Sequence, residues 1–332
     1  MRAALLDGYR TDLEVRDLPV PEPGPGQVLV RVGGAGLCHS DLHLADGDIP
    51  VLPSFPWVLG HEVAGWVEAL GRGVRGVSHG EPVAIFGGWG CGTCRVCVGG
   101  NEQLCNTTSW LGIGHPGGFA RYVVAPVRHL VPLGSLDPVA GAPLTDAALT
   151  PYRAVRKALP RLVPGSTAVI IGCGGLGQMA VQLLSVLSPA RIVVIEPSER
   201  RGGMARERGA AEVFHPDDEA VSGLGGEADA VLDFVGSDGT LAMAGSFAGV
   251  GGLVVILGIA GGSLPVSFFA PTAEVEVTTS YWGNRAELEQ VIALAQAGRI
   301  SVPVHEMDLA AVNIAMKQLR AGEVDGRIVL IP

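Results

Sequence analysis

The sequence lacks an excess of positive charge. Its formal net charge is −10, and only two of its basic residues, Lys157 and Lys317, are lysines. An acidic chain is repelled by phosphate backbones and by anionic lipid headgroups. We therefore expect neither nucleic acid nor a membrane surface as a partner. The preference for arginine over lysine indicates a high-GC coding bias and says nothing about function.

The sequence also lacks an apolar leader, internal repeats and a low-complexity linker. Asp7 lies where a signal peptide needs an apolar core, so we expect a cytoplasmic protein. The segment 163–190 carries no charge and is long enough to span a bilayer. Five glycines interrupt it, however, and a turn signature lies in its middle, so we interpret it as part of a buried sheet. The length of 332 residues predicts two domains.

Cysteine is scarce but concentrated, because four of the six cysteines fall within fifteen residues. Cys91, Cys94, Cys97 and Cys105 form the pattern C-x2-C-x2-C-x7-C in a glycine-rich stretch. In a cytosolic chain such spacing favours a metal over disulfides, and four thiolates suit one tetrahedral structural zinc. An iron–sulfur cluster uses similar spacing, although the proline typical of such motifs does not follow the last cysteine.

The stretch 164–196 has the order strand, glycine turn, helix, strand. Thr167–Ile171 is a short apolar β-branched run, Leu176–Leu187 has an apolar helical pattern, and Arg191–Ile195 is a second apolar run. The turn between the first two is G-x-G-x-x-G, made by Gly172, Gly174 and Gly177, and Glu196 follows 19 residues later. These parts in this order are the fingerprint of a dinucleotide-binding unit, in which the helix start receives the pyrophosphate.

The remaining pattern divides the chain into a β-rich beginning and an α/β part. One long helix is predicted over 140–159, with Asp146 in its first turn, where an acid can simply complement the helix dipole. The strand predicted over 274–281 alternates in polarity and is expected at a sheet edge. Further strands are predicted at 2–6, 27–32, 63–69, 228–234, 252–257 and 326–332, and further helices at 239–248, 286–297 and 309–320.

A second group of polar residues precedes these elements. Cys38, His39, Ser40, Asp41 and His43 stand within six residues, and His61-Glu62 leads into a predicted strand. Thiolate, imidazole and carboxylate are all metal ligands. Taken alone, Ser40 or Asp41 is equally well explained as the cap of a short helix.

Together these motifs resemble the zinc-containing medium-chain alcohol dehydrogenases, and are most similar to the bacterial branch that oxidises secondary alcohols. The similarity runs in order through GLCHSD, LGHE, the four-cysteine segment, APLTDAALTPYRAV, the glycine turn and GRIVL. It implies an α/β fold: a GroES-like β-rich catalytic domain at 1–147 and 284–332, and a doubly wound Rossmann domain at 148–283.

The resemblance implies two zinc ions and a set of site residues. The catalytic zinc ligands would be Cys38, His61 and Asp146, the last replacing a cysteine found in many relatives. Catalytic roles fall on Ser40 as proton acceptor, on His43 as the histidine that receives the proton through the cofactor ribose, and on Glu62 beside the metal. Cofactor contacts fall on the turn and on four other residues: His39, Gly172, Gly174, Gly175, Leu176, Gly177, Glu196, Arg201 and Arg327.

The same resemblance implies hydride transfer between a neutral secondary alcohol, or its ketone, and NAD, by a homodimer or homotetramer. Glu196 favours NAD, although Arg200 and Arg201 can offset its charge against a 2′-phosphate. Candidate pocket walls are Trp57, Trp110, Tyr281 and Trp282, each of which can equally be a core residue. The alternatives are a specialised biosynthetic or NADP-dependent reductase, a zinc-free reductase of the same fold, and a dinucleotide-binding protein without catalysis.

Overall fold

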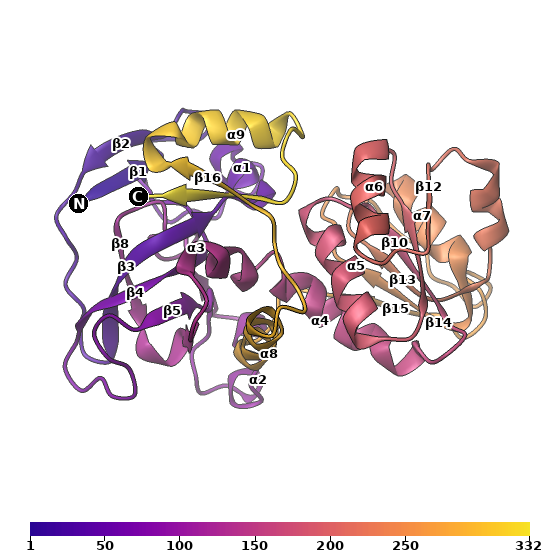
Figure 1. The fold of residues 1–332 in the computed structure, drawn as a ribbon, viewed down its shortest axis with the longest axis horizontal. Helices are drawn as coiled ribbons and strands as arrows, with labels where there is room; N and C mark the ends of the chain where they lie inside the picture. Colours follow the sequence, from indigo (N-terminus) through magenta and orange to yellow (C-terminus); the bar gives the residue numbers. More distant parts are fainter. The chain divides into compact units, whose positions relative to one another are not determined.

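The computed structural model describes residues 1–332 and forms two compact units (Figure 1). The first unit contains Met1–Leu149 and Gly283–Pro332, and the second contains Thr150–Trp282. The chain therefore leaves the first unit once and returns to it, and both termini belong to the first unit. None of the helices is both long enough and apolar enough to cross a membrane.

The first unit is built on a seven-stranded sheet with the strand order β16-β17-β3-β4-β5-β9, in which β8 also pairs with β3. The last strand of the chain, β17, lies inside this sheet, antiparallel to β3 and parallel to β16. The sheet thus joins the beginning and the end of the sequence. Its strands are β3 Gln27–Gly36, β4 Glu62–Leu70, β5 Pro82–Ile85, β8 Tyr122–Pro126, β9 Leu130–Pro132, β16 Val304–Asp308 and β17 Arg327–Ile331.

Short elements complete the first unit. The helix α9 buries Val312, Ala315, Met316 and Leu319, the i, i+3, i+4, i+7 pattern that predicts an amphipathic helix here. Two small antiparallel pairs, β1 with β2 and β6 with β7, lie outside the main sheet. The elements are β1 Arg2–Leu5, β2 Glu14–Asp17, β6 Gly88–Trp89, β7 Ser109–Trp110, α1 His39–Asp46, α2 Arg95–Val98, α3 Pro138–Gly141, α8 Arg285–Gln296 and α9 Val312–Arg320.

The second unit is a six-stranded parallel sheet with the order β12-β11-β10-β13-β14-β15. In chain order this is 3-2-1-4-5-6, the doubly wound arrangement whose switch point lies between the first and fourth strands. The edge position expected for the strand near 274–281 is confirmed, because β15 ends the sheet. The elements are β10 Thr167–Ile171, β11 Arg191–Ile195, β12 Glu212–Phe214, β13 Ala228–Asp233, β14 Ala248–Ile256, β15 Glu276–Thr279, α4 Leu149–Ala158, α5 Gly175–Leu187, α6 Glu199–Glu207 and α7 Asp238–Phe247.

The single helix predicted over 140–159 is wrong. The structure has α3, a 3₁₀ turn at Ala142–Thr145, a break, and then α4. Pro143 has no N–H with which to continue α3, whereas Pro151 lies in the first turn of α4, where its N–H is not needed. Asp146 lies in the break with φ −139° and ψ −58°, so it is not the first-turn helix acid that the pattern indicated.

The turn between β10 and α5 packs as the glycine pattern predicts. Gly172 has φ +84°, a conformation that favours glycine. A Cβ at Gly177 would overlap the carbonyl oxygen of Gly172, whereas a Cβ at Gly174 would meet no atom within 4 Å. Gly177 is therefore required for packing, and Gly174 leaves open space in front of the turn.

We predict that Gly177→Ala lowers the free energy of unfolding by about 1–3 kcal/mol, because the new methyl group has no room. Gly174→Ala should cost less than about 1 kcal/mol. Gly203→Ala is the matched control: it lies inside α6 with no atom within 4 Å of the added Cβ, and should raise stability by about 0.5–1 kcal/mol. Urea unfolding of the cofactor-free protein measures all three. Equal stability of the Gly177 and Gly174 variants would contradict the packing argument.

Candidate active site and metal centres

Four potential ligands converge inside the first unit although they come from three distant parts of the sequence. Cys38, His61, Glu62 and Asp146 place their ligand atoms within 4.8 Å of one another. Cys38 is the N-cap of α1, His61 and Glu62 are at the start of β4, and Asp146 lies in the break before α4. All four are buried, so their charges cannot be solvated by water.

The geometry of three of these residues fits a zinc ion. Cys38 Sγ lies 3.7 Å from Asp146 Oδ2, and His61 Nε2 lies 3.7 Å from the same oxygen. Tetrahedral zinc with ordinary bond lengths separates its ligand atoms by about 3.3–3.8 Å. One sulfur, one nitrogen and one oxygen ligand leave a fourth position for substrate, as catalytic zinc sites require. The structure thus brings together the three ligands expected from the sequence.

Asp41 is a member of this site that the sequence left as a possible helix cap. Its Oδ2 accepts a hydrogen bond from the Cys38 N–H at 2.9 Å, and its Oδ1 accepts one from the Gly60 N–H at 3.3 Å. The same Oδ1 lies 3.4 Å from His61 Nδ1, and the side chain is fully buried. A carboxylate on the outer nitrogen of a ligating histidine fixes its ring orientation and raises its basicity. The C-x-x-D spacing of the capping box was the available signal.

Glu62 is held by a buried arginine from the other end of the chain. Arg327 Nη2 lies 2.6 Å from Glu62 Oε1 and 3.6 Å from Asp146 Oδ2. Burial raises the pKa of the Glu62 carboxyl, and the guanidinium of Arg327 acts in the opposite direction. Arg327 was expected to contact the cofactor; the structure places its guanidinium on Glu62, beside the metal ligands.

Ser40 and His43 lie on α1, one helical turn apart. Ser40 Oγ is 3.7 Å from Cys38 Sγ, which places its hydroxyl beside the ligand cluster. His43 is 39% exposed, and its Nδ1 lies 3.2 Å from the carboxylate of Asp48. Residues three apart on a helix share a face, so Ser40 and His43 lie on the same face of α1. His39, expected at the cofactor, is the exposed first residue of this helix.

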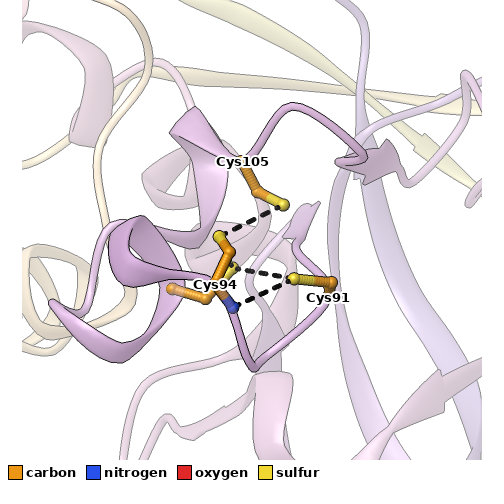
Figure 2. Close-up of side chains that lie close together, drawn as sticks. Cys91, Cys94 and Cys105 are labelled. Atoms are coloured by element: carbon orange, nitrogen blue, oxygen red, sulfur yellow. Dashed lines mark hydrogen bonds between the residues drawn. The ribbon is translucent and has the colours of Figure 1, made fainter.

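The four cysteines of the C-x2-C-x2-C-x7-C pattern form a second cluster (Figure 2). Neighbouring sulfur atoms are 3.5 Å apart for Cys94–Cys97, 3.8 Å for Cys94–Cys105 and 3.9 Å for Cys91–Cys97. Zinc–thiolate bonds in a tetrahedral site separate the sulfurs by about 3.8 Å. The cluster therefore fits one zinc ion, with no ligand position left for a substrate.

Charged residues fix the shape of this cysteine lobe. Glu102 accepts a hydrogen bond from the Gly90 N–H at 3.1 Å, and Arg128 Nη2 donates to the Gly90 carbonyl at 2.7 Å. Glu102 and Arg128 also pair with each other at 3.1 Å. The peptide groups just before Cys91 are thus held from both sides. Hydrogen bonds to the Cys91 thiolate, of which the bond from the Thr93 backbone has the largest effect, lower the pKa of Cys91 to about 5. Burial raises the pKa of Cys97 to about 12.

In the second unit, the glycine turn presents the start of α5. Gly174 is the N-cap of α5 and, having no side chain, leaves the first N–H groups of this helix without a side-chain partner. Such N–H groups bind phosphate. Glu196, which directly follows β11, is only 5% exposed, and its Oε2 accepts a hydrogen bond from the Cys173 N–H at 2.7 Å. Arg201 lies in the first turn of α6 and is half-buried.

The four candidate pocket walls divide between the units. Trp57 belongs to the apolar core of the first unit, and its indole N–H donates to the Gly112 carbonyl at 3.1 Å. Trp110 is half-buried in β7. Tyr281 is 57% exposed, and Trp282, with φ +49°, ends the second unit. A positive φ is unusual for a bulky residue. Trp57 thus has a packing role that needs no substrate, and the wall assignment of all four stays a prediction.

We predict two zinc ions per purified chain, one in each cluster, and one in either Cys38→Ala or Cys94→Ala. Each variant removes one ligand from one cluster and leaves the other intact. Cys173→Ala is the control, because Cys173 is buried but belongs to neither cluster. Metal analysis by mass spectrometry after dialysis counts the ions. One zinc ion in the parent protein, unchanged in Cys38→Ala, would show that this cluster is not a metal site.

Comparison with known proteins agrees with this architecture. Residues 24–135 match the alcohol dehydrogenase GroES-like domain family, and residues 175–297 match the zinc-binding dehydrogenase family. An NAD-dependent alcohol dehydrogenase of Sulfurisphaera tokodaii is 36% identical over the full length of both chains. A D-arabinose 1-dehydrogenase (NADP(+)) of Saccharolobus solfataricus is 34% identical and covers 100% of this chain and 97% of its own.

A solved structure, the alcohol dehydrogenase of the archaeon Aeropyrum pernix, superimposes with a TM-score of 0.92 at 35% identity and covers 100% of both chains. These matches confirm the expected fold class, a GroES-like domain with a Rossmann domain. With its two zinc-compatible clusters and its glycine turn, the chain belongs to the zinc-dependent medium-chain alcohol dehydrogenase family.

Proposed function

We propose that this protein is a zinc-dependent dehydrogenase that transfers hydride between a neutral secondary alcohol, or its ketone, and NAD. The observation that carries the proposal is the Cys38/His61/Asp146 cluster, because its three ligands leave one coordination position for a substrate oxygen. The glycine turn before α5 supports dinucleotide binding. The relative from Sulfurisphaera tokodaii is named as an enzyme of the same class.

The chain's own residues account for the proton transfer and for the geometry. A zinc ion bound by the cluster would act as a Lewis acid toward the substrate oxygen. Ser40 Oγ accepts the substrate hydroxyl proton beside the cluster, and His43 passes it toward solvent. Asp41 holds the ring of His61, and Arg327 holds the carboxylate of Glu62. Nicotinamide chemistry belongs to the cofactor.

Glu196 is the residue that favours NAD over NADP. Its carboxylate lies beside the turn, where a 2′-phosphate would face a like charge costing on the order of 4 kcal/mol at about 4 Å and an effective dielectric of 20. Arg200 and Arg201 follow in α6 and oppose this repulsion. Relatives of this chain are named as NAD-dependent alcohol dehydrogenases, and one relative is named for NADP. We propose NAD because the acid directly follows β11, the position that binds ribose hydroxyls.

The substrate is proposed to be neutral because the guanidinium beside the ligand cluster is already used. Arg327 is paired with Glu62 and Asp146. A carboxylate or phosphate substrate therefore has no visible clamp. We further propose a cytoplasmic homodimer or homotetramer. Its six cysteines form no disulfide, which fits a reducing compartment.

A substrate panel tests this function. We expect NAD-linked oxidation of small secondary alcohols to exceed that of matched primary alcohols, with charged hydroxy acids unreactive. D-Arabinose belongs in the panel because one relative is named for it. Each substrate should be assayed with NAD and with NADP, and kcat/KM compared. A clear preference for a charged acid, or for NADP, would overturn the corresponding part of the proposal.

We predict that Ser40→Ala slows alcohol oxidation by about 10²–10⁴-fold, the usual contribution of a positioned proton acceptor. Zinc content and the cofactor dissociation constant should remain unchanged, since Ser40 is not one of the clustered ligands. Ser40→Thr retains a hydroxyl at the same place and should retain most of the rate. If the alanine variant keeps the full rate at neutral pH, Ser40 is only part of the helix start.

A further inference from the structure

Glu196 is buried and uses both carboxylate oxygens in hydrogen bonds to the backbone. Its Oε2 accepts a hydrogen bond from the Cys173 N–H at 2.7 Å, and its Oε1 accepts one from the Ser198 N–H at 3.0 Å. The residue is only 5% exposed. An acid that served only to bind a ribose would not need two backbone partners.

The first of these partners belongs to the glycine turn itself. The Gly172 N–H donates to the Ile195 carbonyl at 2.9 Å, and the next N–H, that of Cys173, donates to Glu196. Two consecutive N–H groups therefore tie the turn to the end of β11. The first tie is made by backbone alone and does not depend on the side chain of residue 196. The second depends entirely on the side chain of residue 196.

The turn needs such a tie because glycine is conformationally free. Gly172 has φ +84°, and a Cβ at Gly174 would meet no neighbour within 4 Å, so the start of α5 has no packed side chain at Gly174, and the buried side chain of Cys173 is the packed one in this part of the turn. The N-cap Gly174 sets the direction of the first N–H groups of α5. A shift of Cys173 moves Gly174 and with it the phosphate-binding end of the helix.

We propose that Glu196 is a positioning residue for the glycine turn, in addition to any contact with the cofactor ribose. Its charge and its acceptor oxygen then do separable things: the charge selects between NAD and NADP, and the oxygen shapes the turn for both. Each carboxylate oxygen has two lone pairs, so one bond to a backbone N–H leaves room for a ribose hydroxyl. The cofactor part of this proposal rests on the proposed function.

Two variants without charge separate the two roles. Glu196→Gln keeps an acceptor oxygen for the Cys173 N–H and loses the acceptor for the Ser198 N–H, whereas Glu196→Met has a similar length and an acceptor for neither. Dissociation constants for NAD and NADP are measured by calorimetry. Hydrogen–deuterium exchange of the peptide that contains Cys173 is measured without cofactor. If the methionine variant does not fold, Glu196→Ala, in which water can reach both N–H groups, takes its place.

We expect Glu196→Gln to shift the ratio of affinities toward NADP by about tenfold or more and to leave exchange at Cys173 as in the parent protein. Glu196→Met should bind both cofactors about two- to tenfold more weakly than Glu196→Gln does, the range for one hydrogen bond between neutral groups. Exchange at Cys173 should accelerate in this variant.

Asp229→Ala is the matched control. Asp229 Oδ2 accepts a hydrogen bond from the Thr167 N–H at 2.7 Å, at the opposite end of the same strand β10. This variant also removes a carboxylate that holds a backbone N–H, but it should leave both dissociation constants and exchange at Cys173 unchanged. A general loss of stability of the second unit would instead affect both variants alike.

Equal affinities and equal exchange in the glutamine and methionine variants would overturn the positioning role and leave Glu196 as a ribose contact only. If the parent protein binds neither cofactor, the proposed function fails instead. Exchange at Cys173 in the cofactor-free variants still decides the positioning role in that case, because the tie exists without a ligand.

Discussion

The first unit depends on one electrostatic constraint: several acidic side chains are buried within a few ångströms of one another. Cys38, Glu62 and Asp146 lie in the cluster, and the carboxylate of Asp41 lies against His61. Buried anions are unstable unless cations and hydrogen-bond donors compensate them. Arg327 supplies one positive charge, backbone N–H groups hold Asp41, and a divalent cation is the natural remaining partner.

Much of the local geometry follows from meeting this constraint. The chain breaks between the 3₁₀ turn and α4, which takes Asp146 out of a helix and places it against Cys38 and His61. Gly36 has no side chain because Glu62 fills the space in which its Cβ would lie. β17 pairs with β3 and begins with Arg327. The start of one helix, the starts of two strands and the break before α4 thus meet at the same cluster.

In the second unit, the backbone rather than a cluster of side chains provides the candidate binding site. The turn after β10 lies at the switch point of a parallel sheet, and the helix that follows it starts without a side-chain cap. Anion binding there needs only N–H groups and the helix dipole. Glu196 is a buried acid whose side chain accepts a hydrogen bond from this turn. The same side chain therefore affects both the shape of the turn and the charge beside it.

The sequence alone determined the features whose causes are local. The strand, turn, helix and strand of 164–196 follow from side-chain periodicity and from glycine positions, and the structure has these elements within a residue of the predicted bounds. The four-cysteine cluster follows from short spacing, because so few intervening residues keep the thiols close together. The motifs along the whole chain also indicate the family from the sequence alone.

Only the tertiary structure decided which distant groups meet and which oxygens they use. Cys38 and Asp146 are 108 residues apart, and no periodicity records that contact. Arg327 can pair with Glu62 only because β17 lies inside the sheet. The apolar pattern of 140–159 predicted one continuous helix and gave no sign of the break at Asp146. Asp41 and Glu196 had plausible local roles in the sequence. Their second roles arise from long-range hydrogen bonds, which leave no local sequence signal because the partners are backbone groups that every residue type provides.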